Sequence, residues 1–307
     1  MKTNELNGTI DYSKVSLKQE KPKSEKVKLT IERVLVYIFL IFLSILCLFP
    51  FYILIINSTR DTHSIQQEFT LIPGSHFIEN WTGLMSNAHL PILKALWNSI
   101  WVSGFSAILT VYFSALTAYA VHTYSFKGKK FIETFILAIM MIPTQVAAMG
   151  LVMVAAKYNF FGHYGILYSM LILPCIASPA VYFYMKQYLD SVLPYEIIEA
   201  ARVDGSSEIR IFHQMILPIL KPALAVQFIF SYVSSWNNFF MPSMLLRDKE
   251  SYTVPIIFTQ LNNDTQYPRE YGQIYLLMAL AVVPVVIVYL IFSRSIIKNL
   301  TAGAVKG

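Results

Sequence analysis

The chain has 307 residues, of which 24 are Lys or Arg and 18 are Asp or Glu. Charged residues make up 14% of it and hydrophobic residues 55%, whereas an average soluble domain carries roughly 25% charged residues. So little polar surface cannot cover a water-soluble globule of this size, which argues against a soluble or disordered protein. The net charge of +6 leaves one question, namely where the positive charge lies relative to a membrane.

Six stretches are apolar and long enough to cross about 30 Å of hydrocarbon, which takes about 20 residues in a helix. The first is uncharged, too long for a signal peptide, and followed by no small-residue cleavage site, so we expect it to be retained. The sequence therefore predicts an all-α polytopic membrane protein whose six spans run approximately Val34–Ile56, Leu93–Val121, Phe131–Ala156, Ile166–Leu189, Leu224–Leu246 and Gly272–Ser293.

The distribution of Lys and Arg over the connecting loops predicts the orientation. Counted over alternate compartments, 18 of the 24 lie on the side that holds both ends of the chain, and six lie on the other. Both termini are therefore expected in the cytoplasm, with residues 1–33 as a basic cytoplasmic tail and residues 34–307 as the membrane domain. The basic excess follows from topology, and no nucleic-acid partner is needed to explain it.

Motifs of catalysis and of ion coupling are absent from the sequence. It has no G-x-x-x-x-G-K-[ST], H-E-x-x-H or G-x-S-x-G motif, and we expect no catalytic residue and no metal site. The few ionisable residues near the spans lie at their ends, which argues against a proton-coupled carrier. Cys47 and Cys175 both fall inside predicted spans, where small apolar fillers are the usual reading. The sequence thus indicates that energy for any transport comes from another chain.

The longest cytoplasmic loop, about residues 190–222, predicts two short helices that meet at a sharp corner. Pro194 suits the first helical position, Glu196 favours the first turn, and Gly205 is typical of a left-handed helix stop. Ser206 or Ser207 then caps a second helix, which is expected to end at Pro218 and Pro222. From these residues alone, a hairpin on the membrane surface and a docking element for a cytoplasmic partner are equally good interpretations.

The residues of this loop also carry a family resemblance. Glu199-Ala200-Ala201-x-x-Asp204-Gly205, followed eleven residues later by Ile216-Leu217-Pro218, resembles the EAA loop of binding-protein-dependent ABC importer permeases. Trp236-Asn237-Asn238-Phe239 and the C-terminal Gly303–Gly307 are similar to carbohydrate-uptake permeases of the maltose MalG type. The likeness covers roughly residues 30–307, and Ser206 departs from the alanine more common in the family.

The resemblance implies a type I importer permease (MetI-like) fold in the bacterial plasma membrane. It also implies a transport mechanism driven by partner subunits. The chain would pair with a second, MalF-like permease chain and with two copies of an ATP-binding subunit, which would hold ATP and Mg; this chain would bind no cofactor. The helix from Pro194 to Asp204 would dock on one ATPase subunit, and Lys306 in the C-terminal tail would lie near it. An extracytoplasmic sugar-binding protein would deliver a di- or oligosaccharide from the opposite side of the lipid bilayer.

Polar residues in the spans are candidates for a sugar pathway, although an interhelical hydrogen bond, typically worth about 0.6 kcal/mol, explains each one equally simply. These candidates are Gln145, Gln227, Ser234, Ser235, Trp236, Asn237 and Asn238. Prolines are expected to kink or interrupt the spans at Pro143, Pro174, Pro179, Pro242 and Pro284.

Two further functions stay open at this point, a stand-alone secondary carrier for a polar solute and a membrane-embedded enzyme. A carrier predicts sequence repeats between the two halves, and an enzyme predicts clustered His, Asp or Glu at one depth; the sequence shows neither. The loop from Asn57 to Pro91, containing a turn at Leu71-Ile72-Pro73-Gly74, is either a docking surface for the binding protein or a plain connection.

Overall fold

The computed structural model describes residues 23–87, 90–176, 178–263 and 269–304. Throughout these ranges the secondary structure is helical, and no strand occurs in them. The chain divides into two compact units, residues 1–52 and 53–307. Most of the basic tail predicted over residues 1–33, and Lys306, lie outside the described residues.

Helix α1 (Lys23–Ser58) begins in the first unit and ends in the second. From Glu32 to Ser58 it is long and apolar enough to cross a membrane, as the sequence predicts. Pro50 lies inside this helix without ending it.

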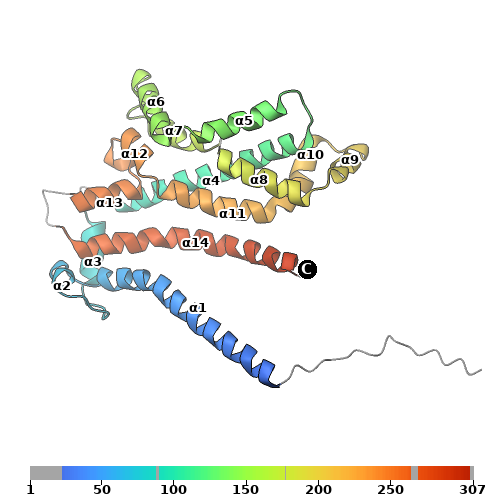
Figure 1. The fold of residues 1–307 in the computed structure, drawn as a ribbon. Coiled ribbons are helices and arrows are strands. Elements are labelled where there is room, and N and C mark those ends of the chain that lie inside the picture. Colours follow the sequence, from blue (N-terminus) through green and yellow to red (C-terminus); the bar gives the residue numbers. More distant parts are fainter. Residues whose placement is uncertain (1–22, 88–89, 177, 264–268, 305–307) are drawn as a thin grey trace, which may run out of the picture. The chain divides into compact units, whose positions relative to one another are not determined.

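The second unit is built around α4 (Ile92–Thr123), against which α7 (Tyr164–Ile176), α8 (Pro179–Val192) and α11 (Leu217–Trp236) pack (Figure 1). Along α4 the buried positions are mostly Ser, Ala, Thr and Val, and such small residues allow helix axes in a membrane to approach closely. Helix α14 (Tyr271–Ala304) packs on α11 and remains one helix despite Pro284.

Two of the six predicted spans are interrupted, at Pro143 and Pro179, where the sequence predicts that prolines kink or interrupt them. The third is divided into α5 (Lys129–Met140) and α6 (Thr144–Lys157), which are bent by 88°. The fourth is divided into α7 and α8, and Pro179 begins the second piece. Proline lacks a donor for the helix ladder and restricts the residue before it, so Pro143 and Pro179 each start a new helix.

By length and composition, four described helices can each cross a membrane, and a fifth span is counted if the bent α5–α6 pair is one. The expected class, an all-helical polytopic membrane fold, is confirmed, while four or five spans rather than about six are counted among the described residues. Hydropathy measures apolar length and is insensitive to a change of direction within it.

The fifth predicted span is shifted toward the N-terminus. Helices α10 (Glu208–Ile211), η2 (Phe212–Ile216) and α11 continue one another from Glu208 to Trp236, followed by a separate α12 (Phe240–Leu245). The prediction that the short helix ends at Pro218 and Pro222 is therefore wrong. The π-helical turn of η2 is wider than an α turn, because the Leu217 N–H bonds to the Phe212 carbonyl, and this accommodates the proline that follows.

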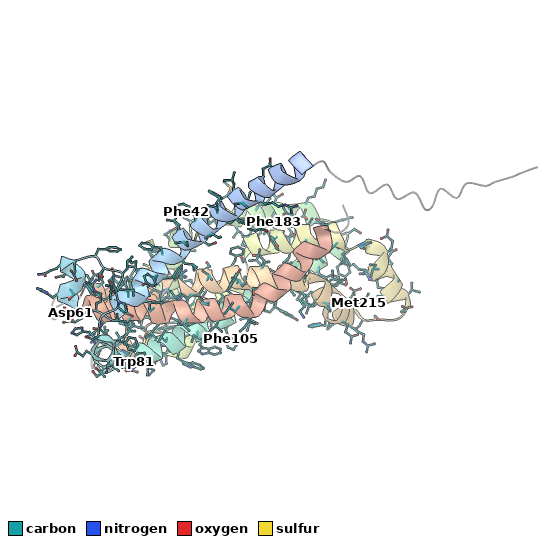
Figure 2. The ribbon with its side chains drawn as sticks, turned by 90° about the horizontal axis from the view of Figure 1, so that it is seen from below. Phe42, Asp61, Trp81, Phe105, Phe183 and Met215 are labelled. Carbon is teal, nitrogen blue, oxygen red and sulfur yellow. The ribbon has the colours of Figure 1, made fainter. Side chains whose placement is uncertain are left out.

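The remaining helices lie at the two ends of the second unit. Helix α9 (Tyr195–Val203) and α10 lie at one end, whereas α2 (Thr62–Gln67), α3 (Phe77–Met85) and α13 (Val254–Asn263) lie at the other (Figure 1). The short η3 (Lys249–Ser251) packs against α4. Figure 2 shows the same separation, with Asp61 and Trp81 at one end and Met215 at the other.

Candidate functional site

The corner between α9 and α10 has the conformation that the sequence predicts. Gly205 has φ +79°, in the left-handed region, and its N–H bonds to the Arg202 carbonyl while the Ser206 N–H bonds to the Ala201 carbonyl, both at 3.0 Å. These two bonds form a Schellman motif, which ends α9 sharply and satisfies its last carbonyls. Pro194 occupies the N-cap rather than the first helical position, one residue earlier than expected.

One face of α9 is buried and the other is open. Ile198 and Ala201 pack into a cluster with Leu193, Ile211 and Phe212, which seats the corner on the ends of α4 and α8. The predicted docking residues Glu199, Ala200, Asp204 and Gly205 are all exposed. Beside them Val203 is 87% and Ile209 74% exposed, so the open face presents apolar side chains. The corner therefore combines a rigid base with an apolar outer surface.

The other three predicted docking residues lie further along the chain. Ile216 is fully buried, Leu217 is half-buried and Pro218 is exposed, and they lie where the π-helical turn passes into α11. The structure thus gathers Glu199, Ala200, Asp204 and Gly205 on the open face, whereas Ala201 belongs to the buried base. Ile216, Leu217 and Pro218 lie in the helix that leads away from the corner.

A polar clamp across the corner is not apparent from the sequence. The Arg202 Nε donates to Glu208 Oε1 at 2.6 Å, and the Tyr119 hydroxyl donates to Glu208 Oε2 at 2.7 Å. Arg202 also donates to the Tyr195 hydroxyl at 3.3 Å and lies over the Tyr124 ring. The Glu208 carboxylate raises the pKa of Arg202 further above its usual value, so this side chain stays charged. The clamp joins α9, α10 and the end of α4.

A second polar cluster joins α4, α5 and α8 near the same end. Lys186 Nζ lies 2.8 Å from Asp190 Oδ2 and 3.6 Å from Glu133 Oε1, and the Asp190 carboxylate also lies 2.8 Å from His122 Nδ1. The sequence assigns Glu133, Lys186 and Asp190 only to span ends. The structure connects them into one network that holds α5 against α8.

The candidate pathway residues are only partly gathered. Ser235, Trp236 and Asn238 line a small cavity together with Ser99, Ser103 and Thr253. Trp236 also lines a second cavity, together with Asn237, Phe239, Phe258 and Thr259. Gln145 is exposed on α6, Gln227 is half-buried on α11, and Ser234 is exposed; none of these three lines either cavity. The segment from Ser235 to Asn238, where α11 ends, is thus the polar centre among the candidates.

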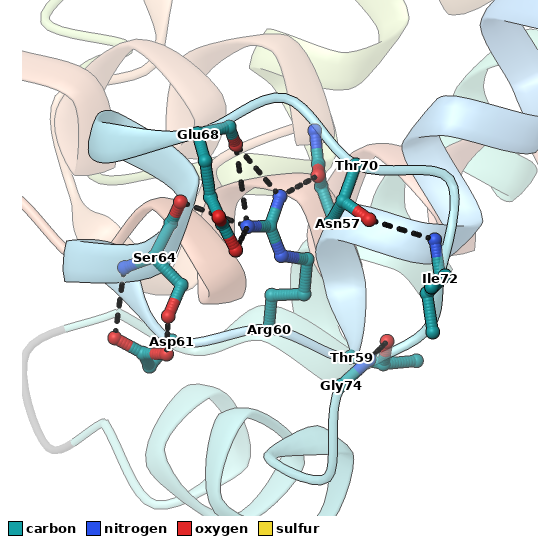
Figure 3. A network of polar contacts seen from close by, with 9 residues as sticks. All are labelled: Asn57, Thr59, Arg60, Asp61, Ser64, Glu68, Thr70, Ile72 and Gly74. Atoms are coloured by element: carbon teal, nitrogen blue, oxygen red, sulfur yellow. Dashed lines mark hydrogen bonds and ion pairs between the residues drawn. The ribbon is translucent and has the colours of Figure 1, made fainter.

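The loop after α1 is organised by a buried arginine, as Figure 3 shows. Arg60 is 4% exposed, and its guanidinium donates to the carbonyls of Ser64 at 2.8 Å and of Glu68 at 3.2 Å and lies 3.5 Å from the Glu68 carboxylate. Asp61 caps α2 by accepting bonds from the Ser64 N–H and hydroxyl, and these bonds lower the pKa of Asp61 to about 2. These contacts give the loop a defined structure around Arg60.

A multi-pass helical membrane protein with a rigid, exposed helical corner at one end is the class that these features define. The family described as binding-protein-dependent transport system inner membrane component matches residues 123–301. This range covers more than half of the chain and includes the whole corner. The chain belongs to this family.

Relatives and solved structures agree with that assignment. The chain is 31% identical to the arabinooligosaccharides transport system permease protein AraQ of Bacillus subtilis over 91% of this chain and 97% of the relative. It is 30% identical to the trehalose/maltose transport system permease protein MalG of Thermococcus litoralis, covering 90% and 98%. It is 29% identical to the sn-glycerol-3-phosphate transport system permease protein UgpE of Yersinia enterocolitica, covering 86% and 94%.

The fold is similar to that of a chain in the crystal structure of a bacterial ABC transporter involved in the import of the acidic polysaccharide alginate. The TM-score is 0.71 at 17% identity, with 90% of this chain and 98% of that chain covered. A second structure, of a bacterial alginate ABC transporter in complex with alginate pentasaccharide-bound periplasmic protein, gives a TM-score of 0.56 at 18% identity, covering 86% and 95%. At this identity the likeness establishes the fold.

Proposed function

We propose that this chain is the membrane-spanning permease subunit of an ATP-driven importer of a sugar or oligosaccharide. The observation that carries the proposal is the corner at Gly205, where exposed Glu199, Val203 and Ile209 stand on a buried base that is continuous with α11. A surface that transmits motion must be stiff, and two helices locked by a Schellman motif and a charged clamp are stiffer than a loop.

The corner would dock on an ATP-binding subunit, two copies of which would bind ATP and Mg and supply the energy. This chain would be non-catalytic and would bind no cofactor itself. A second permease chain would complete the pathway, and an extracytoplasmic binding protein would deliver the solute to the end that carries α2 and α3. The corner would then face the cytoplasm, in agreement with the positive charge counted in the sequence.

The sugar class rests on relatives named for arabinooligosaccharides and for trehalose and maltose. The cavity that Trp236 and Asn237 line with Phe239, Phe258 and Thr259 suits such a solute, because aromatic faces with amide and hydroxyl groups nearby offer both stacking and hydrogen bonding. One relative is named for sn-glycerol-3-phosphate transport, so a phosphorylated polyol is the alternative class of solute. An assay that compares binding of sugars with binding of this solute separates the two.

The test compares Gly205→Val with Gly162→Val in the chain purified with its native partners. Both glycines have positive φ, +79° and +94°, and a Cβ at either meets open space, so the backbone penalty of roughly 1–2 kcal/mol is matched. Gly162 lies between α6 and α7, away from the corner. We expect Gly205→Val to lose the ATP-binding subunit on purification and to lose sugar-stimulated ATP hydrolysis, while Gly162→Val retains both.

Normal assembly and uptake in Gly205→Val would contradict the docking role. Uptake that persists with an ATP-binding subunit unable to hydrolyse ATP, but stops when the proton gradient is collapsed, would instead identify a stand-alone secondary carrier. Each outcome is read in the same reconstituted vesicles.

A further inference from the structure

Three of the four tryptophans are exposed at the end of the second unit opposite to the Gly205 corner. Trp97 is 66% exposed and Trp81 and Trp101 are 39% exposed, whereas Trp236 is 4% exposed. Trp81 belongs to α3, and Trp97 and Trp101 belong to the first three turns of α4, which contacts α3. Tryptophan is enriched where hydrocarbon meets water, because its ring is apolar and its N–H is polar.

Helix α3 exposes large apolar side chains on its outer face, although it also buries Leu84 and exposes Glu79. Its polar Asn80 is buried, and the Asn80 side-chain amide donates to the carbonyls of Ser58 and Arg60, both at 2.9 Å. Its outer face carries Phe77, Ile78 and Trp81, and Ile78 is 70% exposed. In water this arrangement leaves costly apolar surface uncovered. A medium other than bulk water must therefore cover the outer face.

The loop before α3 extends the same surface. Phe69, Leu71 and Ile72 are all exposed, and Phe69 and Ile72 each reach 72%. This loop cannot easily turn these side chains inward, because Arg60 binds the Glu68 carbonyl and the Gly74 N–H donates to the Thr59 hydroxyl at 2.8 Å. We call Phe69, Leu71, Ile72, Phe77, Ile78 and Trp81 the collar. The fold holds the collar outward.

We propose that the collar lies in the lipid interface and anchors this end of the permease in the outer boundary of the bilayer. Continuity with the membrane-spanning surface is the reason for choosing lipid: Leu93 is 67% exposed on α4 beside Trp97, and α4 is one of the helices able to cross the membrane. Lys94 and Glu250, an exposed ion pair one turn from Trp97, then lie at the water boundary. Charged ends with apolar stems suit that position.

This places α3 along the membrane surface, in the way that monotopic helices lie on a bilayer. The collar is therefore distinct from any surface that receives a binding protein, which needs access from water. The inference does not depend on which solute is carried, and only its assignment to the outer boundary rests on the proposed cytoplasmic side of the Gly205 corner.

The experiment measures the surroundings of single nitroxide labels in the full chain, assembled with its native partners in vesicles of phosphatidylethanolamine and phosphatidylglycerol. Cys47→Ser and Cys175→Ser remove the native thiols, and the labelled variants are Ile78→Cys and Trp81→Cys. Glu79→Cys is the matched control on the same helix, since the Glu79 side chain is 76% exposed. All three positions are exposed, so the labels replace no buried contact.

We expect collisions with dissolved oxygen, which concentrates in lipid, to exceed collisions with a water-soluble nickel chelate several-fold at positions 78 and 81. Position 79 should show the opposite ratio. Equal, water-like ratios at all three positions would overturn the proposal. Low accessibility to both reagents at 78 and 81 would also overturn it, because that result means that protein, not lipid, covers the collar.

Discussion

The guanidinium of Arg202 and the carboxylate of Glu208 meet across the Gly205 turn, with Nε and Oε1 2.6 Å apart. The two residues belong to different helices, α9 and α10, so their bond fixes the angle between them. The Tyr119 hydroxyl, from α4, occupies the second oxygen of the same carboxylate. The orientation of the proposed docking surface is thereby tied to the central helix of the membrane domain.

Replacing Arg202 with Ala is expected to lower sugar-stimulated ATP hydrolysis strongly while changing stability little. The pair is partly exposed, and exposed ion pairs contribute about 1 kcal/mol or less. The corner would persist but lose its fixed angle. ATPase activity and thermal unfolding of the purified complex measure the two effects separately. Arg210→Ala, at an exposed cation on α10, is the control and should behave as wild type. Wild-type ATPase activity of Arg202→Ala would refute a role for the clamp.

Replacing Gly272 with Ala is expected to destabilise the end that carries α2 and α3. An added Cβ would lie 2.5 Å from the Arg60 carbonyl oxygen and would press on the Asn80 side chain. Overpacking of this kind typically costs about 1–3 kcal/mol. Gly104→Ala, inside α4, meets nothing within 4 Å and should be neutral or slightly stabilising. Thermal unfolding in detergent compares them, and equal midpoints would show that the Gly272 contact can relax.

Replacing Arg60 with Lys is expected to loosen the loop from residue 59 to residue 76. A lysine keeps the charge, but its ammonium group lacks the planar guanidinium geometry that donates to the Ser64 and Glu68 carbonyls together. Bonds to charged groups are worth about 1.5–3 kcal/mol each, and a carbonyl left unpaired adds to the loss. Limited proteolysis of vesicles, with cleavage sites read by mass spectrometry, should show faster cleavage in this loop. Unchanged cleavage would mean that Arg60 is not what orders it.

Acid is expected to unwind α2 through Asp61. The hydrogen bonds from Ser64 lower the pKa of Asp61 to about 2 from an ordinary value of 3.8, so the folded state prefers the charged carboxylate. The cap therefore stabilises α2 fully above pH 4, and this contribution is lost as the pH falls from 4 toward 2. Hydrogen exchange of α2, corrected for intrinsic rates, measures the change. Asp61→Asn keeps an acceptor oxygen without the titration and should show no change over this range; a matching loss in that variant would assign the transition to another group.

The corner could be predicted from the sequence because its determinants are local. Gly205, Pro194 and Glu196 each act within a turn of their own position, through the left-handed stop, the restricted proline and the helix dipole. The clamp could not be predicted in the same way, since Tyr119 lies 89 positions before Glu208 and only the packing of α4 brings them together. Opposite charges on Arg202 and Glu208 were the only local sign of it.

The broken spans show the same division between local and distant causes. Pro143 and Pro179 are visible as interruptions, but the 88° bend between α5 and α6 depends on what the two pieces pack against. The sequence predicts that Pro218 and Pro222 end a helix, and they do not. Pro218 follows directly after the π-helical turn at Phe212–Ile216, whereas Pro222 lies inside α11. Trp236 and its polar neighbours were recognised as a group, whereas Gln145 and Gln227 were grouped with them by residue type alone.

The unbroken course from Glu208 to Trp236 makes this helix a lever. Its 29 residues, at about 1.5 Å each, span roughly 43 Å from the Gly205 corner to the cavities beside Trp236. A tilt of about 10° about one end of a rod of this length displaces the other end by roughly 7 Å. The wide turn at Phe212–Ile216 lies next to the corner, and beyond it α11 continues to Trp236 with Pro222 inside the helix.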